Sequence, residues 1–234
     1  YDFITKPIED LDIFNVKIRR AIEKRMYVLQ EKRYKESLED DIQKKADLLE
    51  EGALSRLIRR YGVTTMWLTS SLCNRYAEED PASFAPLRRL LTGGEALSVR
   101  HIQRIRDACP GLTIVNGYGP TENTTFTTTH AIRDADLALP AIPIGRPVGN
   151  TLVKILDAYD DPAPIGVWGE ICTGGDGLAL GYWHDPELTA QRFIEDPARP
   201  GERLYRTGDY GRWSESGVVE FLGRRDDQFK LRGF

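Results

Sequence analysis

The sequence has few of the residues that build metal sites and covalent frameworks. Its 234 residues include three cysteines and three histidines. Cys73, Cys109 and Cys172 lie far apart, form no C-x-x-C pair and lack the spacing of a zinc site. An odd number of distant cysteines also argues against a disulfide framework. We therefore expect three reduced thiols in a cytoplasmic protein.

The histidines form no familiar catalytic or metal-binding pattern. His101, His130 and His184 belong to no H-E-x-x-H or H-x-H motif, which argues against a metal site built on histidine. The chain also lacks the G-x-S-x-G turn that would present a serine nucleophile.

Long apolar runs and a basic balance are absent as well. No run of 18 apolar residues is present, so we expect no transmembrane helix and no membrane partner. The net charge of -4 argues against nucleic-acid binding, which needs a concentrated basic face. The opening residues YDFITKP do not read as a signal peptide, and because they lack an initiator Met we expect a fragment of a longer protein.

Glycine and tryptophan are missing from the first fifth of the chain. The first glycine is Gly52 and the first tryptophan is Trp67. Between Leu11 and Leu49, apolar residues recur at steps of three and four, the pattern of an amphipathic helix. About 40 helical residues would extend roughly 60 Å, too long to pack on a small core alone. We therefore expect this arm to project into solvent or to form a dimer through residues 10–50.

The segment YDFITKPIEDLDIFNVKIRRAIEKR resembles the last strand, Lys-Pro turn and last helix of a response-regulator receiver domain. That resemblance implies a helical linker over residues 1–51. In that family the lysine matching Lys6 contacts a phosphorylated aspartate, but the acidic pocket and phosphoacceptor strand are absent. The alternative is that this part is only a helical arm.

From Gly52 onward the pattern is α/β. LSRLIRRYG predicts a helix that ends at Gly62, and SVRHIQRIRDAC predicts a second helix with Ser98 as its N-cap. VTTMWLT, LRRLLTGGE and LTIVNGYG predict strands, so residues 52–130 should form a largely parallel sheet with ligands at the carboxyl ends of its strands. Residues 131–223 lose the helical pattern, and LVKILD, GEICTGG and VVEFLG predict a small β-barrel or sheet layer.

The stretch NGYGPTENTT combines groups that suit a nucleoside triphosphate. Gly117 and Gly119 would allow a flat ligand to approach the backbone, and Tyr118 would offer a ring face for a base. Thr121 supplies a hydroxyl, and Glu122 supplies a carboxylate of the kind that Mg²⁺ prefers. Glycine-tyrosine loops are also common as plain turns.

A second candidate is Asp209 in YRTGD, which we expect near a strand end. Its carboxylate could accept both hydroxyls of a ribose, although a Gly-Asp pair alone is also a common hairpin turn. GRRDDQFKLRGF, taken alone, reads as a solvated cluster of charges.

Five motifs in this order resemble the adenylation domain of non-ribosomal peptide synthetases, within the acyl-adenylate-forming enzymes. They are LLTGGEALS, NGYGPTENTTF, GEICTGGDGLALGYW, YRTGD and GRRDDQFKLRGF, and the resemblance covers residues 52–234. It implies ATP-dependent activation of an amino acid to an aminoacyl adenylate with Mg²⁺. It also implies transfer to the phosphopantetheine of a peptidyl carrier domain, with a condensation domain in the parent protein.

The resemblance also implies roles for particular residues. The adenine edge would contact Asn116, its face would stack on Tyr118, and the backbone of Gly117 and Gly119 would lie close by. Thr121 would touch the α-phosphate, Glu122 would ligate Mg²⁺, and Asp209 would bind the ribose with Arg224 nearby. Residues 224–234 would lead to a further subdomain with Asp226 as the hinge, and Gly233 would line the pantetheine tunnel. The amino-acid pocket would be lined by Trp67, Leu91, Gly93, Gly94, Gly117, Thr125 and Phe126.

Some family features have no counterpart in the sequence. The phosphate-binding loop, the aspartate that pairs with the substrate's amino group and the catalytic lysine are not found. Losing two such groups would slow the chemistry roughly 10⁴-fold or more, so we expect weak ATP binding without completed adenylation. Two other functions stay open: an acyl-CoA ligase of the same superfamily, or a signalling and dimerisation scaffold that carries an inactive adenylation fragment.

Overall fold

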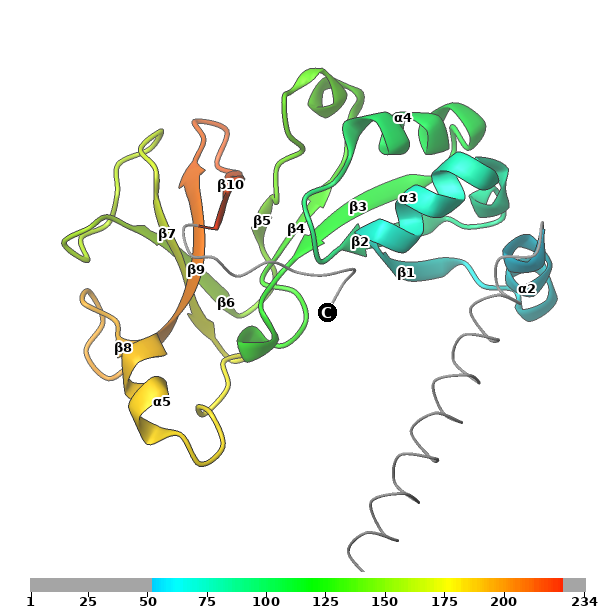
Figure 1. Ribbon diagram of the computed structural model, residues 1–234. Coiled ribbons are helices and arrows are strands. Elements are labelled where there is room, and N and C mark those ends of the chain that lie inside the picture. Colours follow the sequence, from blue (N-terminus) through cyan, green and yellow to red (C-terminus); the bar gives the residue numbers. More distant parts are fainter. Residues whose placement is uncertain (1–51, 225–234) are drawn as a thin grey trace, which may run out of the picture. The chain divides into compact units, whose positions relative to one another are not determined.

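The computed structural model describes residues 52–224 (Figure 1). Contacts divide the chain into two compact units, Tyr1–Ala53 and Leu54–Phe234. Several predictions fall outside the described residues: the receiver-like segment with Lys6, the helix that would form a dimer, the hinge at Asp226, and Gly233.

The first sheet has three parallel strands followed by two antiparallel ones. In spatial order they are β1 (Thr65–Thr69), β2 (Arg89–Gly93), β3 (Thr113–Tyr118), β4 (Thr128–Ala131) and β5 (Arg146–Pro147). The three predicted strands are therefore confirmed, and their carboxyl ends meet at one edge. The domain boundary predicted at residues 130 and 131 falls inside β4, and the sheet continues to Pro147.

Helices cover one face of this sheet. They include α3 (Ser70–Glu79) and α4 (Val99–Ala108), which pack against each other (Figure 1). Leu90 of β2 and Ile114 of β3 are fully buried, as is Ile105 of α4. The helix α2 (Ala53–Tyr61) ends as predicted before Gly62, whose φ of +60° suits a residue without a Cβ. Helix α3 has no counterpart among the predicted elements, and neither does helix α5 (Pro186–Arg192), which contradicts the expectation that the helical pattern is lost over residues 131–223.

Ser98 occupies the predicted N-cap position of α4, but its side chain does not cap the helix. Its Oγ lies 2.7 Å from Nδ1 of His101, whose Nε2 is 2.8 Å from Glu78 Oε1. The hydroxyl is therefore drawn to a neighbouring side chain and is not available to the helix backbone.

The second sheet is antiparallel and has the order β10-β9-β7-β6, with β8 beside β9. Of the two predicted alternatives, a small β-barrel and a sheet layer, the structure shows the sheet layer. Its core contains Ile144, Val153, Ile155, Ile171 and Val219. The elements are β6 (Thr151–Leu156), β7 (Gly169–Gly175), α5 (Pro186–Arg192), β8 (Phe193–Glu195), β9 (Arg203–Trp213) and β10 (Val219–Arg224).

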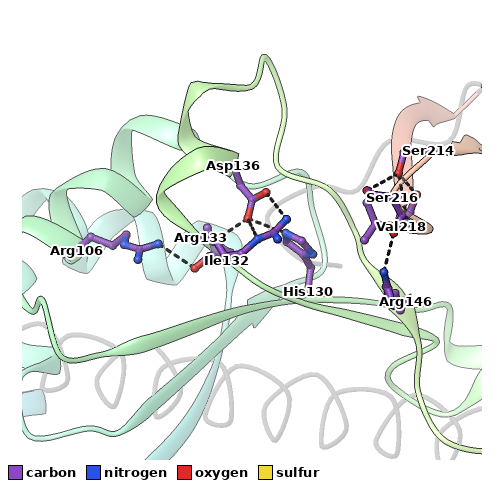
Figure 2. A network of polar contacts seen from close by, with 9 residues as sticks. All are labelled: Arg106, His130, Ile132, Arg133, Asp136, Arg146, Ser214, Ser216 and Val218. Carbon is purple, nitrogen blue, oxygen red and sulfur yellow. Dashed lines mark hydrogen bonds and ion pairs between the residues drawn. The ribbon is translucent and has the colours of Figure 1, made fainter.

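Two regions join the sheets. Near β5, Gly145 forms an isolated bridge with Val219, and Arg146 Nη2 donates to the carbonyl oxygen of Ser216 at 2.6 Å (Figure 2). In the 3-10 helix η2 (Thr121–Asn123), the buried amide of Asn123 donates to Thr173 Oγ1 of β7 at 2.6 Å.

A buried polar network fixes the chain after β4, where the 3-10 helix η3 (Asp134–Ala138) begins (Figure 2). His130 Nε2 lies 2.8 Å from Asp136 Oδ2, and the backbone amide of Arg133 donates to the same oxygen at 2.7 Å. Arg106 of α4 donates to the carbonyl oxygen of Ile132. Burial works to raise the pKa of the Asp136 carboxyl, but these hydrogen bonds outweigh it and the pKa is lowered.

Candidate functional site

A cavity of about 370 Å³ opens at the carboxyl ends of β2 and β3 and is closed by β9 and β10. It is lined by backbone and apolar side chains, with a few polar groups among them. That composition is typical of a site for a small organic ligand. Seven of the predicted site residues line it: Gly94, Asn116, Gly117, Tyr118, Gly119, Asp209 and Arg224.

Asp209 does not lie near a strand end as predicted but within β9. Glu170 of β7 pairs with Tyr210, and Cys172 pairs with Arg206, so one residue of β7 faces three residues of β9. Gly208 takes a φ of +74° at this bulge. A bulge bends its strand and redirects side chains, and here Asp209 contributes to the cavity wall.

Tyr118 and Asp209 are joined directly, although 91 residues separate them. The Tyr118 hydroxyl donates to Asp209 Oδ2 at 2.6 Å, and Arg224 Nη1 lies 3.2 Å from Asp209 Oδ1. Burial, together with the charge of Asp209, holds the pKa of the Tyr118 phenol well above its ordinary value, so the phenol remains a donor. The Phe221 ring packs near Tyr118, with centroids 5.9 Å apart.

Asn116 and Gly117 form the opposite part of the wall. The side chain of Asn116 is buried, and its Nδ2 donates to the carbonyl oxygen of Pro143 at 2.9 Å, which fixes the orientation of the amide. Gly93 and Gly117 are paired across β2 and β3, and a Cβ on Gly93 would lie 1.9 Å from the Gly117 carbonyl oxygen. Only glycine fits this approach of the two strands.

Thr121 and Glu122 follow in η2 but do not line this cavity. Glu122 Oε1 accepts a hydrogen bond from the Tyr182 hydroxyl at 2.6 Å, and that hydroxyl is 3.2 Å from the Tyr205 hydroxyl. Burial works to raise the pKa of the Glu122 carboxyl, but hydrogen bonds from the two tyrosines outweigh it and the pKa is lowered. Glu122 is therefore ionised at neutral pH.

A bound Mg²⁺ would fit Glu122, because Mg²⁺ in phosphate-transfer sites is commonly held by one or two carboxylates together with substrate phosphates. Within residues 52–224 there is no group of three or more His, Cys, Asp or Glu residues arranged to hold a metal ion. Glu122 would thus supply one ligand, and phosphate and water oxygens would supply most of the others.

Three of the other predicted pocket residues, Trp67, Leu91 and Phe126, form a separate group. The rings of Trp67 and Phe126 lie 6.5 Å apart, and Leu91 is paired with Trp67 across β1 and β2. Phe126 also packs over Gly117, where a Cβ would lie 2.4 Å from the ring. Trp67, Leu91, Gly93, Thr125 and Phe126 do not line the cavity of Asp209.

The two residues before Phe126 have an unusual backbone conformation. Thr124 and Thr125 have φ values of +41° and +59°, which are costly for β-branched residues. Such strain persists only where surrounding contacts enforce it, and it is common at functional sites. Here Thr124 Oγ1 donates to the carbonyl oxygen of Gly177 at 2.8 Å.

Sequence reasoning missed three aromatic partners: Tyr182, Tyr205 and Phe221. Tyr182 and Tyr205 lie within or beside recognised motifs, so their positions in GYW and YRTGD were a usable signal. Phe221 lies in a predicted strand, but the sequence pattern of that strand does not show that the Phe221 ring would contact Tyr118.

Comparison with known proteins identifies the family of the chain. The sequence matches the family described as AMP-binding enzyme over residues 42–183. The chain belongs to this AMP-binding enzyme family. As predicted, it corresponds to part of an adenylation domain of the non-ribosomal peptide synthetase type.

Curated relatives of this AMP-binding chain are large synthetases. It is 51% identical over 187 residues to tyrocidine synthase 3 of Brevibacillus parabrevis, covering 80% of this chain and 3% of that protein. It is 47% identical over 188 residues to gramicidin S synthase 2 of Brevibacillus brevis, covering 80% of this chain and 4% of that protein. The chain therefore spans only a small part of the relatives it matches.

Solved structures show the same fold. Holo-PA1221, an NRPS protein with adenylation and PCP domains, aligns with a TM-score of 0.76 and 46% identity, covering 79% of this chain and 32% of that one. The NpsA-ThdA di-domain from Klebsiella oxytoca aligns with a TM-score of 0.72 and 30% identity, covering 78% and 34%. Among the described residues of the AMP-binding chain, no helix is both long and apolar enough to cross a membrane.

Proposed function

We propose that the cavity binds the adenosine part of ATP and that the chain contributes this site to amino-acid activation. The observation that carries the proposal is the hydrogen bond between Tyr118 and Asp209 in the wall of one cavity. The Tyr118 ring, which can stack on a base, and the Asp209 carboxylate, which can accept ribose hydroxyls, thus lie together in one cavity. The ordered motifs of the sequence support the same reading.

Each side chain has a proposed role. The buried amide of Asn116 faces the adenine edge, the Tyr118 ring stacks on the base, and Asp209 accepts the ribose hydroxyls beside Arg224. The backbone of Gly117 and Gly119 allows the base to approach closely. Thr121, which is exposed at the start of η2, contacts the α-phosphate.

Glu122 is the proposed Mg²⁺ ligand. When bound, the ion would neutralise charge on the phosphates of ATP. The lowered pKa of Glu122 keeps its carboxylate ionised for this role. The separate group around Trp67 and Phe126 is the proposed wall for the side chain of the amino acid.

In the reaction that we propose for the parent protein, the carboxylate of an amino acid attacks the α-phosphorus of ATP. An acyl-phosphate bond forms, the bond to pyrophosphate breaks, and aminoacyl-AMP results. The acyl group then passes to the phosphopantetheine thiol of a peptidyl carrier domain, with a condensation domain downstream, in the cytoplasm. The names of the relatives, which are peptide synthases, favour this function over an acyl-CoA ligase.

The test is nucleotide binding by the 234-residue chain, measured by isothermal titration calorimetry with ATP and GTP in the presence of Mg²⁺. We expect ATP to bind more tightly than GTP. Replacing Asp209 with Ala should weaken ATP binding roughly 10- to 100-fold, the value of a hydrogen bond to a charged group.

The matched control is Asp107→Ala, which removes an acid from the exposed side of α4 and should leave ATP binding unchanged. Equal affinity of the Asp209→Ala variant and the unchanged chain for ATP would refute the proposed site. Equal affinity for ATP and GTP would contradict the proposal that Asn116 recognises the adenine edge.

A further inference from the structure

The bulge that carries Asp209 leaves backbone groups that the ladder between β7 and β9 does not pair. Thr207 satisfies two of them. Its Oγ1 donates to the carbonyl oxygen of Ile171 at 2.6 Å and accepts from the amide of Asp209 at 3.0 Å. Arg224 Nη1 donates to the carbonyl oxygen of Thr207 at 3.0 Å. The bulge is thus held by side chains at each of these points.

The remaining bulge amide is held by a carboxylate on the neighbouring strand. Gly208 N donates to Glu170 Oε1 at 3.0 Å. Gly208 is the residue with the left-handed backbone, so this bond fixes the turn of the chain just before Asp209. The side chain of Glu170 is only 12% exposed, which makes its hydrogen bonds stronger than those of a fully solvated acid.

Glu170 is itself held in place from the other side. Its Oε2 accepts from Arg206 Nε at 3.0 Å. The far end of Arg206 forms a fork on Asp160, with Nη2 at 2.7 Å from Oδ1 and Nη1 at 3.2 Å from Oδ2. Hydrogen bonds to Asp160 and then to Glu170 raise the pKa of the Arg206 guanidinium, so its charge is permanent. Bidentate pairing of this kind restricts orientation as well as distance.

We propose that Glu170 is a positioning residue for Asp209: it holds the Gly208 amide, and thereby sets the bulge that places the Asp209 carboxylate in the cavity. The contact runs through the backbone, and Glu170 is not among the residues that line the cavity. The inference rests on the proposed function, because a precise orientation of Asp209 matters only if that acid recognises ribose hydroxyls.

The test compares adenosine with 2′,3′-dideoxyadenosine, which lacks both ribose hydroxyls. Binding of each to the 234-residue chain is measured by ligand-observed NMR titration. The unchanged chain should prefer adenosine roughly 10- to 100-fold. Glu170→Ala should reduce this preference below about 3-fold while the affinity for dideoxyadenosine stays the same, since a mere loss of folded protein would lower both affinities.

Three further variants make the result specific. Glu170→Gln retains one oxygen that can accept from Gly208 N but no acceptor for Arg206 Nε, and should restore part of the preference. Glu170→Asp keeps the charge but is one methylene too short to reach the amide, and it should lose the preference as Glu170→Ala does, which provides a second test if the alanine variant fails to fold. Glu220→Ala breaks a comparable cross-strand pair with Arg212 on β9, away from the bulge, and should keep the full preference.

A preference that is unchanged in both Glu170→Ala and Glu170→Asp would overturn the inference. A second readout needs no ligand: the titration of the Tyr118 phenol, followed by NMR of tyrosine labelled at Cζ and assigned with Tyr118→Phe. If Glu170 positions Asp209, its removal should lower the pKa of Tyr118, because Asp209 helps to raise it.

The two proposals can fail separately. If the unchanged chain binds both nucleosides equally, or neither, the ribose role of Asp209 fails. The positioning by Glu170 is then decided by the Tyr118 titration alone. An unchanged Tyr118 pKa in the Glu170 variants would overturn it, and a lowered pKa would support it.

Discussion

At the scale of single residues, the site depends on a carboxylate that is almost fully buried. Asp209 is 8% exposed, and an isolated charge at such a position would be unfavourable by several kcal/mol. Arg224 supplies an opposite charge, while the Tyr118 hydroxyl and the Asp209 backbone amide are fixed in place. The charge of this acid is thus compensated by Arg224 and by the Tyr118 hydroxyl in a cavity whose walls are largely apolar, where an added ligand contact would be strengthened.

Buried thiols should make the protein sensitive to alkaline pH. Burial raises the pKa of Cys73 from 9.0 to about 11 and that of Cys172 to about 12. Above pH 9 the unfolded chain loses these protons while the folded chain keeps them, so the free energy of unfolding should fall as the pH rises. Because one pKa unit corresponds to about 1.4 kcal/mol, the shift of Cys73 should account for about 2 kcal/mol between pH 9 and pH 11.

Urea unfolding of the 234-residue chain at pH 8, 9, 10 and 11 would measure this decline. The double variant Cys73→Ser with Cys172→Ser should show a shallower slope, since serine does not titrate in this range. Some decline should remain from the Tyr118 phenol, whose pKa is also raised. Identical slopes for the variant and the unchanged chain would contradict the role of the thiols.

At the scale of elements, local sequence pattern located six of the ten described strands and two of the four described α-helices, but not their irregularities. Alternating apolar residues predicted β1, β2, β3, β6, β7 and β10, and Gly62 marked the end of α2. Helix α3 was missed although Leu72, Cys73, Tyr76 and Ala77 follow a helical spacing, because no glycine or proline separates this helix from the strand before it. Asp209 was placed near a strand end because Gly208 resembles a turn residue, whereas cross-strand contacts make it a bulge.

The same limit applies to the site. The ordered motifs, through the family that they resemble, identified seven of the sixteen residues that line the cavity. The contacts that these residues make could not be predicted from local pattern, even where a partner such as Tyr182 lies in a recognised motif. Glu170 contacts Gly208, and Tyr182 contacts Glu122, through side chains that come together only when the sheets form.

The junction of β2 and β3 gives a prediction at this scale. Gly93→Ala would place a Cβ 1.9 Å from the backbone oxygen of Gly117, and a backbone atom cannot yield as a flexible side chain can. We expect the substitution to lower the free energy of unfolding by about 3 kcal/mol or more, since overpacking usually costs about 1–3 kcal/mol even where side chains can adjust. Urea unfolding measures the change.

Gly111→Ala is the matched control, because a Cβ there meets no atom within 4 Å. It should be neutral or slightly stabilising, as alanine restricts the unfolded chain. If Gly93→Ala were as stable as this control, the close approach of β2 and β3 at Gly93 and Gly117 would be contradicted. The position of Gly117 in the cavity wall would then be contradicted as well.

At the scale of the whole folded unit, the cavity exists because the two sheets meet. One wall comes from β2 and β3, and the other from β9 and β10. Asp209 can meet Tyr118 only while both sheets are folded and joined. The contacts of Gly145 with Val219 and of Asn123 with Thr173 provide two such joints. Ligand binding and the stability of the junction should therefore be coupled.

This coupling predicts that the sheets unfold together. Trp67 in β1 and Trp213 in β9 report on separate sheets, and labelling each with 5-fluorotryptophan allows both to be followed by ¹⁹F NMR in urea. Their midpoints should coincide, as expected for one cooperative unit. Asn123→Ala removes a buried amide that bonds Thr127 and Thr173. It should lower both midpoints together and reduce the free energy of unfolding by about 1–3 kcal/mol.

The control is Gln103→Ala, which removes an exposed amide on α4 and should change the free energy of unfolding by no more than about 0.5 kcal/mol. Separate midpoints for Trp67 and Trp213 in the unchanged chain would mean that the sheets fold independently and that the cavity is not maintained by their junction.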